Sequence, residues 1–243
     1  MENIYTNNTY LHNNPDWHEA DAGFKAGKIL QLLQRNPVPL QTVAEIGCGS
    51  GQVLVEMAAH LDKHIRFKGF DISPQAIQIA AGKATSQLTF LQEDITLEND
   101  HFFDLLLVID VIEHVEDYFH FLTRLAEKGR YTIFHIPLDM CVWSLFREQM
   151  LVEAKNRIGH IHNFTRVFIE SVLTDKGFRI IDRMYTPPTF EHMTRKQKFV
   201  NAMRKLLFKI SPEFCTKTLG GYSVLLLTEN KASPLQITTN DPL

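Results

Sequence analysis

The stretch VAEIGCGSGQVL, residues 43–54, decides the fold. An apolar run that contains Glu45 leads into Gly47, Gly49 and Gly51, and a helix-like sequence follows. Glycines allow a tight turn and close approach of a ligand, and the start of a helix directs free N–H groups toward that ligand. The pattern predicts a nucleotide-binding turn, although a purely structural turn could have the same sequence. A P-loop is not expected, because no Gly-Lys-Ser/Thr follows.

Short apolar runs alternate with longer helix-like stretches on both sides of this turn. The near-continuous apolar character of several runs suits strands that are buried on both faces of a parallel sheet. The alternation therefore predicts a doubly wound α/β fold. The predicted strands are residues 43–47, 65–71, 88–94, 104–110, 130–136, 178–185 and 222–228.

Composition excludes several classes of protein. The chain has 243 residues, of which 44% are hydrophobic and 22% charged, and its net charge is −3. These values argue against intrinsic disorder and against a globally basic nucleic-acid binder.

The N-terminus does not resemble a signal peptide, and no apolar run of about 18 residues that could span a membrane occurs. The scattered cysteines Cys48, Cys141 and Cys215 form no CxxC pair, so we expect reduced thiols in a cytoplasmic protein.

Acidic residues lie at the ends of the next predicted strands. Asp71 follows Gly51 by twenty residues, where a carboxylate can accept both ribose hydroxyls of a nucleoside. This spacing also suits NAD, so a dehydrogenase remains a rival interpretation. Asp94 could reach an adenine amino group through its carboxylate or an adjacent backbone amide, and Asp110 opens the segment DVIEHVED.

These motifs together resemble those of class I S-adenosylmethionine-dependent methyltransferases. The matching segments are EIGCGSG, GFDIS, QEDI and DVIEHV, followed by GHIHNFTRVFIESVLTDKGF from Gly159. The last segment resembles small-molecule members, including relatives of quinone-biosynthesis O-methyltransferases and of enzymes of polysaccharide pathways. The resemblance covers residues 43–228 and weakens the dehydrogenase interpretation.

The resemblance implies a Rossmann-like sheet of seven strands, of which the last is antiparallel, with S-adenosylmethionine across the carboxyl ends of the first strands. It assigns Glu45 and the glycine loop to the methionine moiety, Asp71 to the ribose, Asp94 with Ile95 to the adenine, and Asp110 to the methionine end or sulfonium, and it places the adjacent Ile72 among the cofactor-binding residues. The implied organisation is an N-terminal helical cap (1–40), a core (41–186 and 221–230) that includes a substrate cap (138–165), a basic helical insertion (187–220) and a flexible tail (231–243).

The predicted function is methyl transfer to a small-molecule or glycan-type acceptor, with oxygen as the expected methylated atom. A protein or nucleic-acid methyltransferase and a non-catalytic S-adenosylmethionine-binding module are the alternatives. No nucleic-acid partner is expected, because Asp110-Val111-Ile112-Glu113 stands where base-methylating enzymes carry an NPPY-type tetrapeptide. The sequence leaves the acceptor, the pathway and the oligomeric state open.

Histidines are the candidate general bases, because their ordinary pKa is near neutral. His135 ends the fifth predicted strand, and His160 and His162 flank a loop of the substrate cap. We expect one of these three to take the acceptor proton, whereas His114 is expected to be structural or to lie on the cofactor side. A metal site from His160, His162 and Asp139 is a weak alternative, because H-x-H alone is poor support, and no metal is expected.

The pattern of residues 195–210, RKQKFVNAMRKLLFKI, predicts a basic amphipathic helix. Its apolar residues fall on one helical side, among six basic residues. Such a helix can fold onto the sheet, bind an acidic substrate, contact an anionic membrane or lipid-linked substrate, or mediate oligomerisation. The apolar set is Phe199, Met203, Leu206, Leu207 and Ile210.

Overall fold

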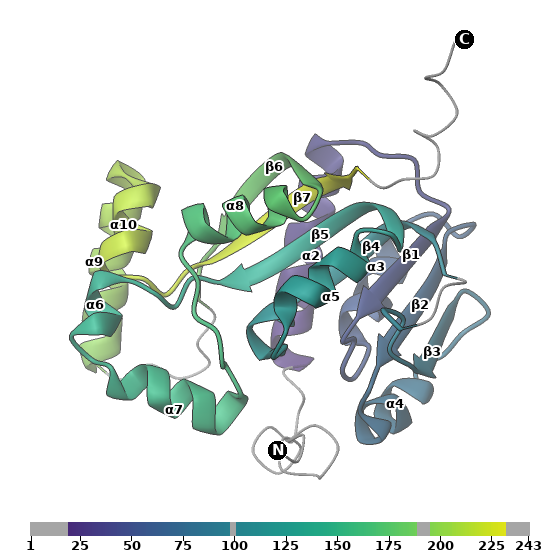
Figure 1. The fold of residues 1–243 in the computed structure, drawn as a ribbon, viewed down its shortest axis with the longest axis horizontal. Coiled ribbons are helices and arrows are strands. Elements are labelled where there is room, and N and C mark those ends of the chain that lie inside the picture. Colours follow the sequence, from purple (N-terminus) through teal and green to yellow (C-terminus); the bar gives the residue numbers. More distant parts are fainter. Residues whose placement is uncertain (1–18, 98–100, 189–194, 232–243) are drawn as a thin grey trace.

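The computed structural model describes residues 19–97, 101–188 and 195–231. A seven-stranded sheet with the order β3-β2-β1-β4-β5-β7-β6 forms its centre (Figure 1). Neighbouring strands from β3 to β5 pair in parallel, whereas β7 is antiparallel to both β5 and β6. This arrangement confirms the expected fold class. The strands are β1 (Thr42–Ile46), β2 (Arg66–Asp71), β3 (Leu88–Gln92), β4 (Phe103–Ile109), β5 (Gly129–Pro137), β6 (Phe178–Thr186) and β7 (Ser223–Asn230).

Both faces of the sheet are covered at its centre, which explains why β1, β4, β5 and β7 are buried along almost their whole length. Successive side chains of a strand point to opposite faces. In β4, Leu106 and Val108 belong to one hydrophobic cluster, and Leu105 and Leu107 belong to another. The first cluster includes buried side chains of α5 and α8, and the second includes those of α2 and α3. The carboxyl ends of the central strands are therefore the edge at which polar groups of the core can meet a ligand.

Several helices begin at a side-chain cap. Ser73, Asp117 and Thr165 each accept a backbone N–H from the first turn of α4, α5 and α8 respectively. The helices are α2 (Glu19–Arg35), α3 (Gln52–His60), α4 (Pro74–Ala81), α5 (Tyr118–Leu125), α6 (Val142–Leu145), α7 (Gln149–Ile158), α8 (Arg166–Asp175), α9 (Arg195–Ile210) and α10 (Pro212–Thr218), with a 3₁₀ turn, η1, at Ile112–His114.

The described part of the N-terminal region is one helix, α2, which lies against α3. Ala26, Ile29 and Leu33 are buried, as the sequence pattern predicts, whereas Leu30 is only half-buried. Arg35, the last residue of α2, forms an ion pair of 2.5 Å with Asp182 of β6. The helix is thus fixed to the sheet at one end and brings its other end to the ligand edge.

Helices α6, α9 and α10 lie together beyond the carboxyl end of β5 (Figure 1). Phe208 of α9 packs against Tyr222, with ring centroids 4.3 Å apart, so this side of α9 holds the helix in place. Helices of the described ranges are all too short or too polar to cross a membrane.

The opposite side of α9 carries the apolar stripe and is exposed. Folding of this stripe onto the sheet, one of the sequence hypotheses, is therefore wrong, because four of its five side chains face outward. The exposed fractions are 67% for Phe199, 49% for Met203, 65% for Leu206 and 74% for Ile210.

Candidate active site

The glycine loop between β1 and α3 has the left-handed backbone that its sequence predicts. Gly47 and Gly51 have φ angles of 70° and 75°. A Cβ atom at Gly51 would lie 2.3 Å from a ring atom of Phe90, and one at Gly47 would lie 2.8 Å from the side chain of Val111. Side chains are excluded at both positions, so the backbone of this loop can approach a ligand closely.

Asp71, at the end of β2, is bound to this loop. One carboxylate oxygen accepts the backbone N–H of Gly49 at 2.8 Å, and the other accepts that of Ser73, also at 2.8 Å. Burial raises the pKa of Asp71, and these N–H groups oppose the rise. Each oxygen keeps a further lone pair, as two ribose hydroxyls require. The adjacent Ile72 side chain is 43% exposed and offers an apolar surface beside the acid.

Glu45 lies inside the sheet behind the glycine loop. Its side chain is buried, and one carboxylate oxygen has no hydrogen-bond partner among the described residues. Burial raises its pKa to about 8, and the nearby charge of Lys25 only partly offsets this. A buried carboxylate without a full set of partners suits a site that receives a cationic group. The ammonium group of the cofactor expected from the sequence would supply one.

Asp94 and Ile95 follow β3 and differ in what they offer. One oxygen of Asp94 accepts both the backbone N–H of Thr96 at 3.0 Å and its hydroxyl at 2.6 Å. The Ile95 side chain is fully buried in the core, so only its backbone could meet a ligand. The structure thus fixes the shape of this turn, and an adenine contact through it stays a prediction.

Asp110, at the end of β4, is the centre of a polar network. Its two carboxylate oxygens lie 2.6 Å from Nδ1 of His135 and 2.8 Å from the ammonium of Lys25. Burial alone would raise the pKa of Asp110, but the charges and hydrogen bonds of His135 and Lys25 hold it well below its usual range. The backbone of Asp110 has a φ angle of 53°, which is uncommon outside glycine and concentrates at functional sites.

In two of the three predicted bases, the Nε2 atom is engaged by a carbonyl or hydroxyl oxygen of the protein. His135 contacts Asp110 through Nδ1 and the Thr186 hydroxyl through Nε2, at 2.8 Å. His162 donates from Nε2 to the carbonyl oxygens of Val115 and Glu116. These contacts hold the strand end and the loop in place. His162 is also not part of the group of potential metal ligands that the described residues form.

A second polar group, which we call the histidine cluster, consists of His160, Asp139, Glu113 and His114. Nδ1 of His160 lies 2.8 Å from a carboxylate oxygen of Asp139, and its Nε2 lies 4.0 Å from Oε1 of Glu113. The ring of His114 is 5.0 Å away, and its Nδ1 donates to the Gly159 carbonyl oxygen at 2.9 Å. Glu113 is fully buried, and neither of its carboxylate oxygens has a hydrogen-bond partner in the described ranges.

The glycine loop and the histidine cluster adjoin each other. Strands β1 and β4 pair in parallel up to Ile46 and Val108, so both chains leave the sheet at the same edge. Val111, between Asp110 and Glu113, lies against Gly47. A ligand on the loop would therefore have the segment from Asp110 to His114 beside it.

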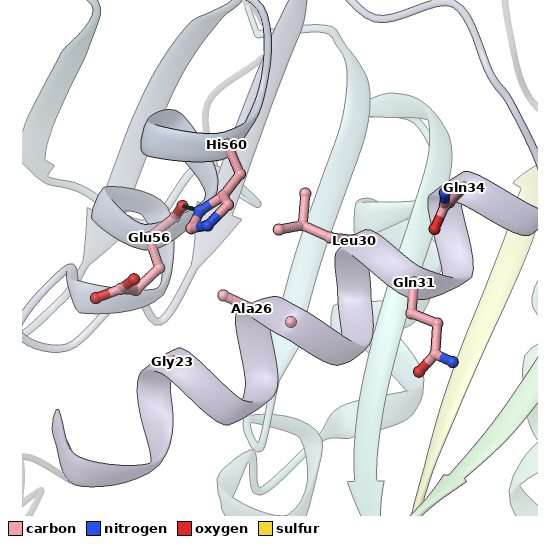
Figure 2. A pocket seen from close by; sticks show the side chains of 8 residues that line it. Gly23, Ala26, Leu30, Gln31, Gln34, Glu56 and His60 are labelled. Carbon is pink, nitrogen blue, oxygen red and sulfur yellow. Dashed lines mark hydrogen bonds between the residues drawn. The ribbon is translucent and has the colours of Figure 1, made fainter.

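A hollow of about 440 Å³ lies elsewhere, between α2 and α3 (Figure 2). Leu30 of α2 extends toward His60 of α3, and His60 donates to the Glu56 carbonyl oxygen at 2.8 Å. The lining contains none of the residues of the glycine loop, the Asp110 network or the histidine cluster. We therefore place the site at the strand ends and not in this hollow.

Comparison with known proteins shows similarity to methyltransferases. A model of a methyltransferase domain matches residues 17–183. The chain is 27% identical to the ubiquinone biosynthesis O-methyltransferase of Rickettsia typhi over 96 residues, 39% of each chain. It is 31% identical to the ajmaline N-methyltransferase of Rauvolfia serpentina over 114 residues, which are 41% of this chain and 38% of the relative. The matches thus span about two fifths of these curated relatives.

The fold is also similar to that of a solved structure, the N-methyltransferase NodS from Bradyrhizobium japonicum in complex with S-adenosyl-L-homocysteine. The TM-score is 0.55 at 16% identity, and the match covers 85% of this chain and 86% of the other.

Proposed function

This chain belongs to the methyltransferase domain family, and on that premise we propose that it is an enzyme that transfers a methyl group from S-adenosylmethionine to a small-molecule or glycan-type acceptor. The observation that carries the proposal is the hydrogen bond from the Gly49 N–H to Asp71, which joins the glycine loop to the acid at the end of β2. The residues present fit the cofactor, because Glu45 supplies an unpartnered carboxylate oxygen behind that loop.

We assign the ribose to Asp71 with Ile72, the adenine to the Asp94–Ile95 turn, and the methionine moiety to Glu45 and the loop glycines. Asp110 holds the methionine end indirectly. Its carboxylate is already engaged by Lys25 and His135, so it positions α2 and the end of β5 around the bound cofactor. Lys25 thereby makes the N-terminal helix part of the site.

The acceptor end lies at the histidine cluster, under the segment 138–165. When bound, the cofactor supplies a methyl group on a positively charged sulfur. The contribution of the chain is to hold the acceptor in line with that group and to exclude water. Among the predicted histidines, His160 is the one with Nε2 turned toward an unbonded acidic group, Glu113, instead of a carbonyl or hydroxyl. We assign His160 to the acceptor.

Oxygen is the atom we propose to be methylated. Relatives include both an O-methyltransferase and N-methyltransferases, so their names do not select one. The His160–Asp139 contact favours oxygen, because a hydroxyl must lose its proton during transfer and gains from a site built of imidazole and carboxylate groups. An amine in its free-base form has less need of such a site.

The exposed stripe of α9 favours a lipid surface or lipid-linked acceptor as partner. Phe199, Met203, Leu206 and Ile210 are exposed, and Lys205 and Lys209 on the same helix are exposed with them. An amphipathic helix of this kind binds anionic interfaces by apolar insertion and charge attraction.

Turnover tests the proposal. The purified protein should convert S-adenosylmethionine to S-adenosylhomocysteine in the presence of hydroxyl-bearing metabolites or glycans from a panel. Asp71→Asn should weaken cofactor binding in the same assay. Binding of the cofactor without turnover on any member of a broad panel, lipid-linked acceptors included, would favour a non-catalytic module.

A further inference from the structure

The strongest unexplained feature of the molecule is the Glu113 carboxylate. It is fully buried at the 3₁₀ turn after β4, and neither oxygen has a hydrogen-bond partner within the described residues. Buried acidic groups in proteins are nearly always paired, hydrogen-bonded or bound to a metal. The Glu113 carbonyl oxygen accepts the backbone N–H groups of Ile161 and His162, at 2.9 and 3.1 Å, so the loop that carries His160 is fixed to this turn.

We propose that Glu113, His114 and His160 form a binding site for a divalent transition-metal ion of the zinc type. One ligand atom from each residue lies within 4.8 Å of the others. Zinc bonds of ~2.0–2.1 Å in tetrahedral geometry place ligand atoms about 3.4 Å apart, so modest side-chain rotations close the site. Two imidazoles and one carboxylate are a set that zinc accepts in catalytic sites, with a position left for another ligand.

Hydrogen bonds prepare both histidines to act as ligands. The Nδ1 of His114 faces the Gly159 carbonyl oxygen, which can only accept, so the proton is on Nδ1. The Nδ1 of His160 faces the Asp139 carboxylate in the same way. A ring with its proton on Nδ1 can bind a metal ion through Nε2, and Nε2 of His160 lies 4.0 Å from Oε1 of Glu113. Carboxylate or carbonyl contacts on the far nitrogen are typical of metal-bound histidines.

The donor set also selects the ion. Imidazole nitrogens suit zinc and neighbouring first-row ions, whereas magnesium and calcium prefer oxygen ligands throughout. The set differs from the sequence expectation, because Glu113 and His114 replace His162 and Asp139. Asp139 instead supports His160 from outside.

The position gives the ion a role that rests on the proposed function. Glu113 is three residues beyond Asp110, and Val111 between them lies against Gly47 of the cofactor loop. An acceptor oxygen in the open coordination position would be held beside the cofactor and polarised there. His160 would then act as a ligand and not as a general base.

Zinc binding to the untagged full chain, freed of metal with a chelator, tests the proposal by calorimetry with ZnCl₂. Wild type should bind one equivalent with a Kd below 1 μM. Glu113→Gln and His160→Asn should each weaken binding by at least tenfold. His120→Asn, at an exposed position of α5, is the matched control and should bind as wild type does.

Cobalt supplies a second measurement that does not depend on activity. One equivalent of Co²⁺ should give visible absorption bands of a nitrogen-ligated ion in wild type and in His120→Asn, and these bands should be lost in Glu113→Gln. Circular dichroism establishes that the variants are folded. Zinc binding weaker than 100 μM, or equal binding by Glu113→Gln and wild type, would overturn the site.

Failure of this proposal and failure of the proposed function are distinguishable. Zinc binding at Glu113 without S-adenosylmethionine binding would keep the metal site and reject the methyltransferase assignment. Cofactor binding and turnover that persist in chelator-treated protein, with no zinc taken up, would reject the metal site alone.

Discussion

Ionisation of Glu45 should make the cofactor-free protein less stable as the pH rises. Burial raises the pKa of this carboxyl from 4.5 to about 8. Between these values the folded state binds the proton more tightly than the unfolded state, so the free energy of unfolding falls with increasing pH. The slope reaches ~1.4 kcal/mol per pH unit. Glu45→Gln keeps the shape and removes the titration. Relative to this variant, wild type should lose about 3 kcal/mol between pH 5.5 and 8.

Urea unfolding followed by circular dichroism measures this difference at each pH. The subtraction of the two proteins cancels the contributions of all other titrating groups, provided that the unfolded states are alike. Glu127→Gln, at an exposed position, is the control and should show no such divergence from wild type. A wild-type to Glu45→Gln difference that stays flat over this pH range would refute the argument that burial governs Glu45.

Three further predictions concern the cofactor, the acceptor and the lipid surface. Asp71→Ala should weaken S-adenosylmethionine binding by ~1–3 kcal/mol in calorimetry, because charge-assisted acceptors of two hydroxyls are removed; unchanged affinity in a folded variant would reject the ribose assignment. If the His160 imidazole takes the acceptor proton, as the proposed function without a metal ion has it, His160→Asn should lower turnover on the true acceptor by ~10²- to 10⁴-fold with little change in cofactor affinity. A loss of cofactor affinity of similar size would place His160 on the cofactor side. Leu206→Ser should reduce flotation with anionic vesicles at low salt; equal recovery with neutral and anionic vesicles would leave no role for charge at α9.

The strands and the glycine loop were predictable because their signals are local. Buried parallel strands require continuous apolar runs, and a turn that excludes every side chain requires glycine. Gly47 and Gly51 show this directly, since a Cβ atom at either position would overlap a neighbouring side chain. Positions of the acids at strand ends followed from the alternation of strands and helices.

Roles that depend on long-range pairing were not predictable from the sequence. Lys25 reaches Asp110 from a helix 85 positions earlier in the chain, and Thr186 reaches His135 from another strand. Glu113 could have been singled out as an acid within DVIEHV, but its lack of partners depends on burial, which the sequence does not reveal. The orientation of α9 was equally hidden, because an amphipathic pattern defines two sides without saying which one faces the protein.

Equilibrium binding of S-adenosylmethionine, compared with NAD on the same untagged protein, tests the central claim most directly. Calorimetry should show one molecule of S-adenosylmethionine or S-adenosylhomocysteine bound per chain, with NAD bound far more weakly. We propose that the Glu45 carboxylate pairs with the ammonium group, which both methionine-derived ligands carry. The corresponding part of NAD has no positive charge. Tighter binding of NAD, or no binding of either methionine-derived ligand, would contradict the assignment of this site.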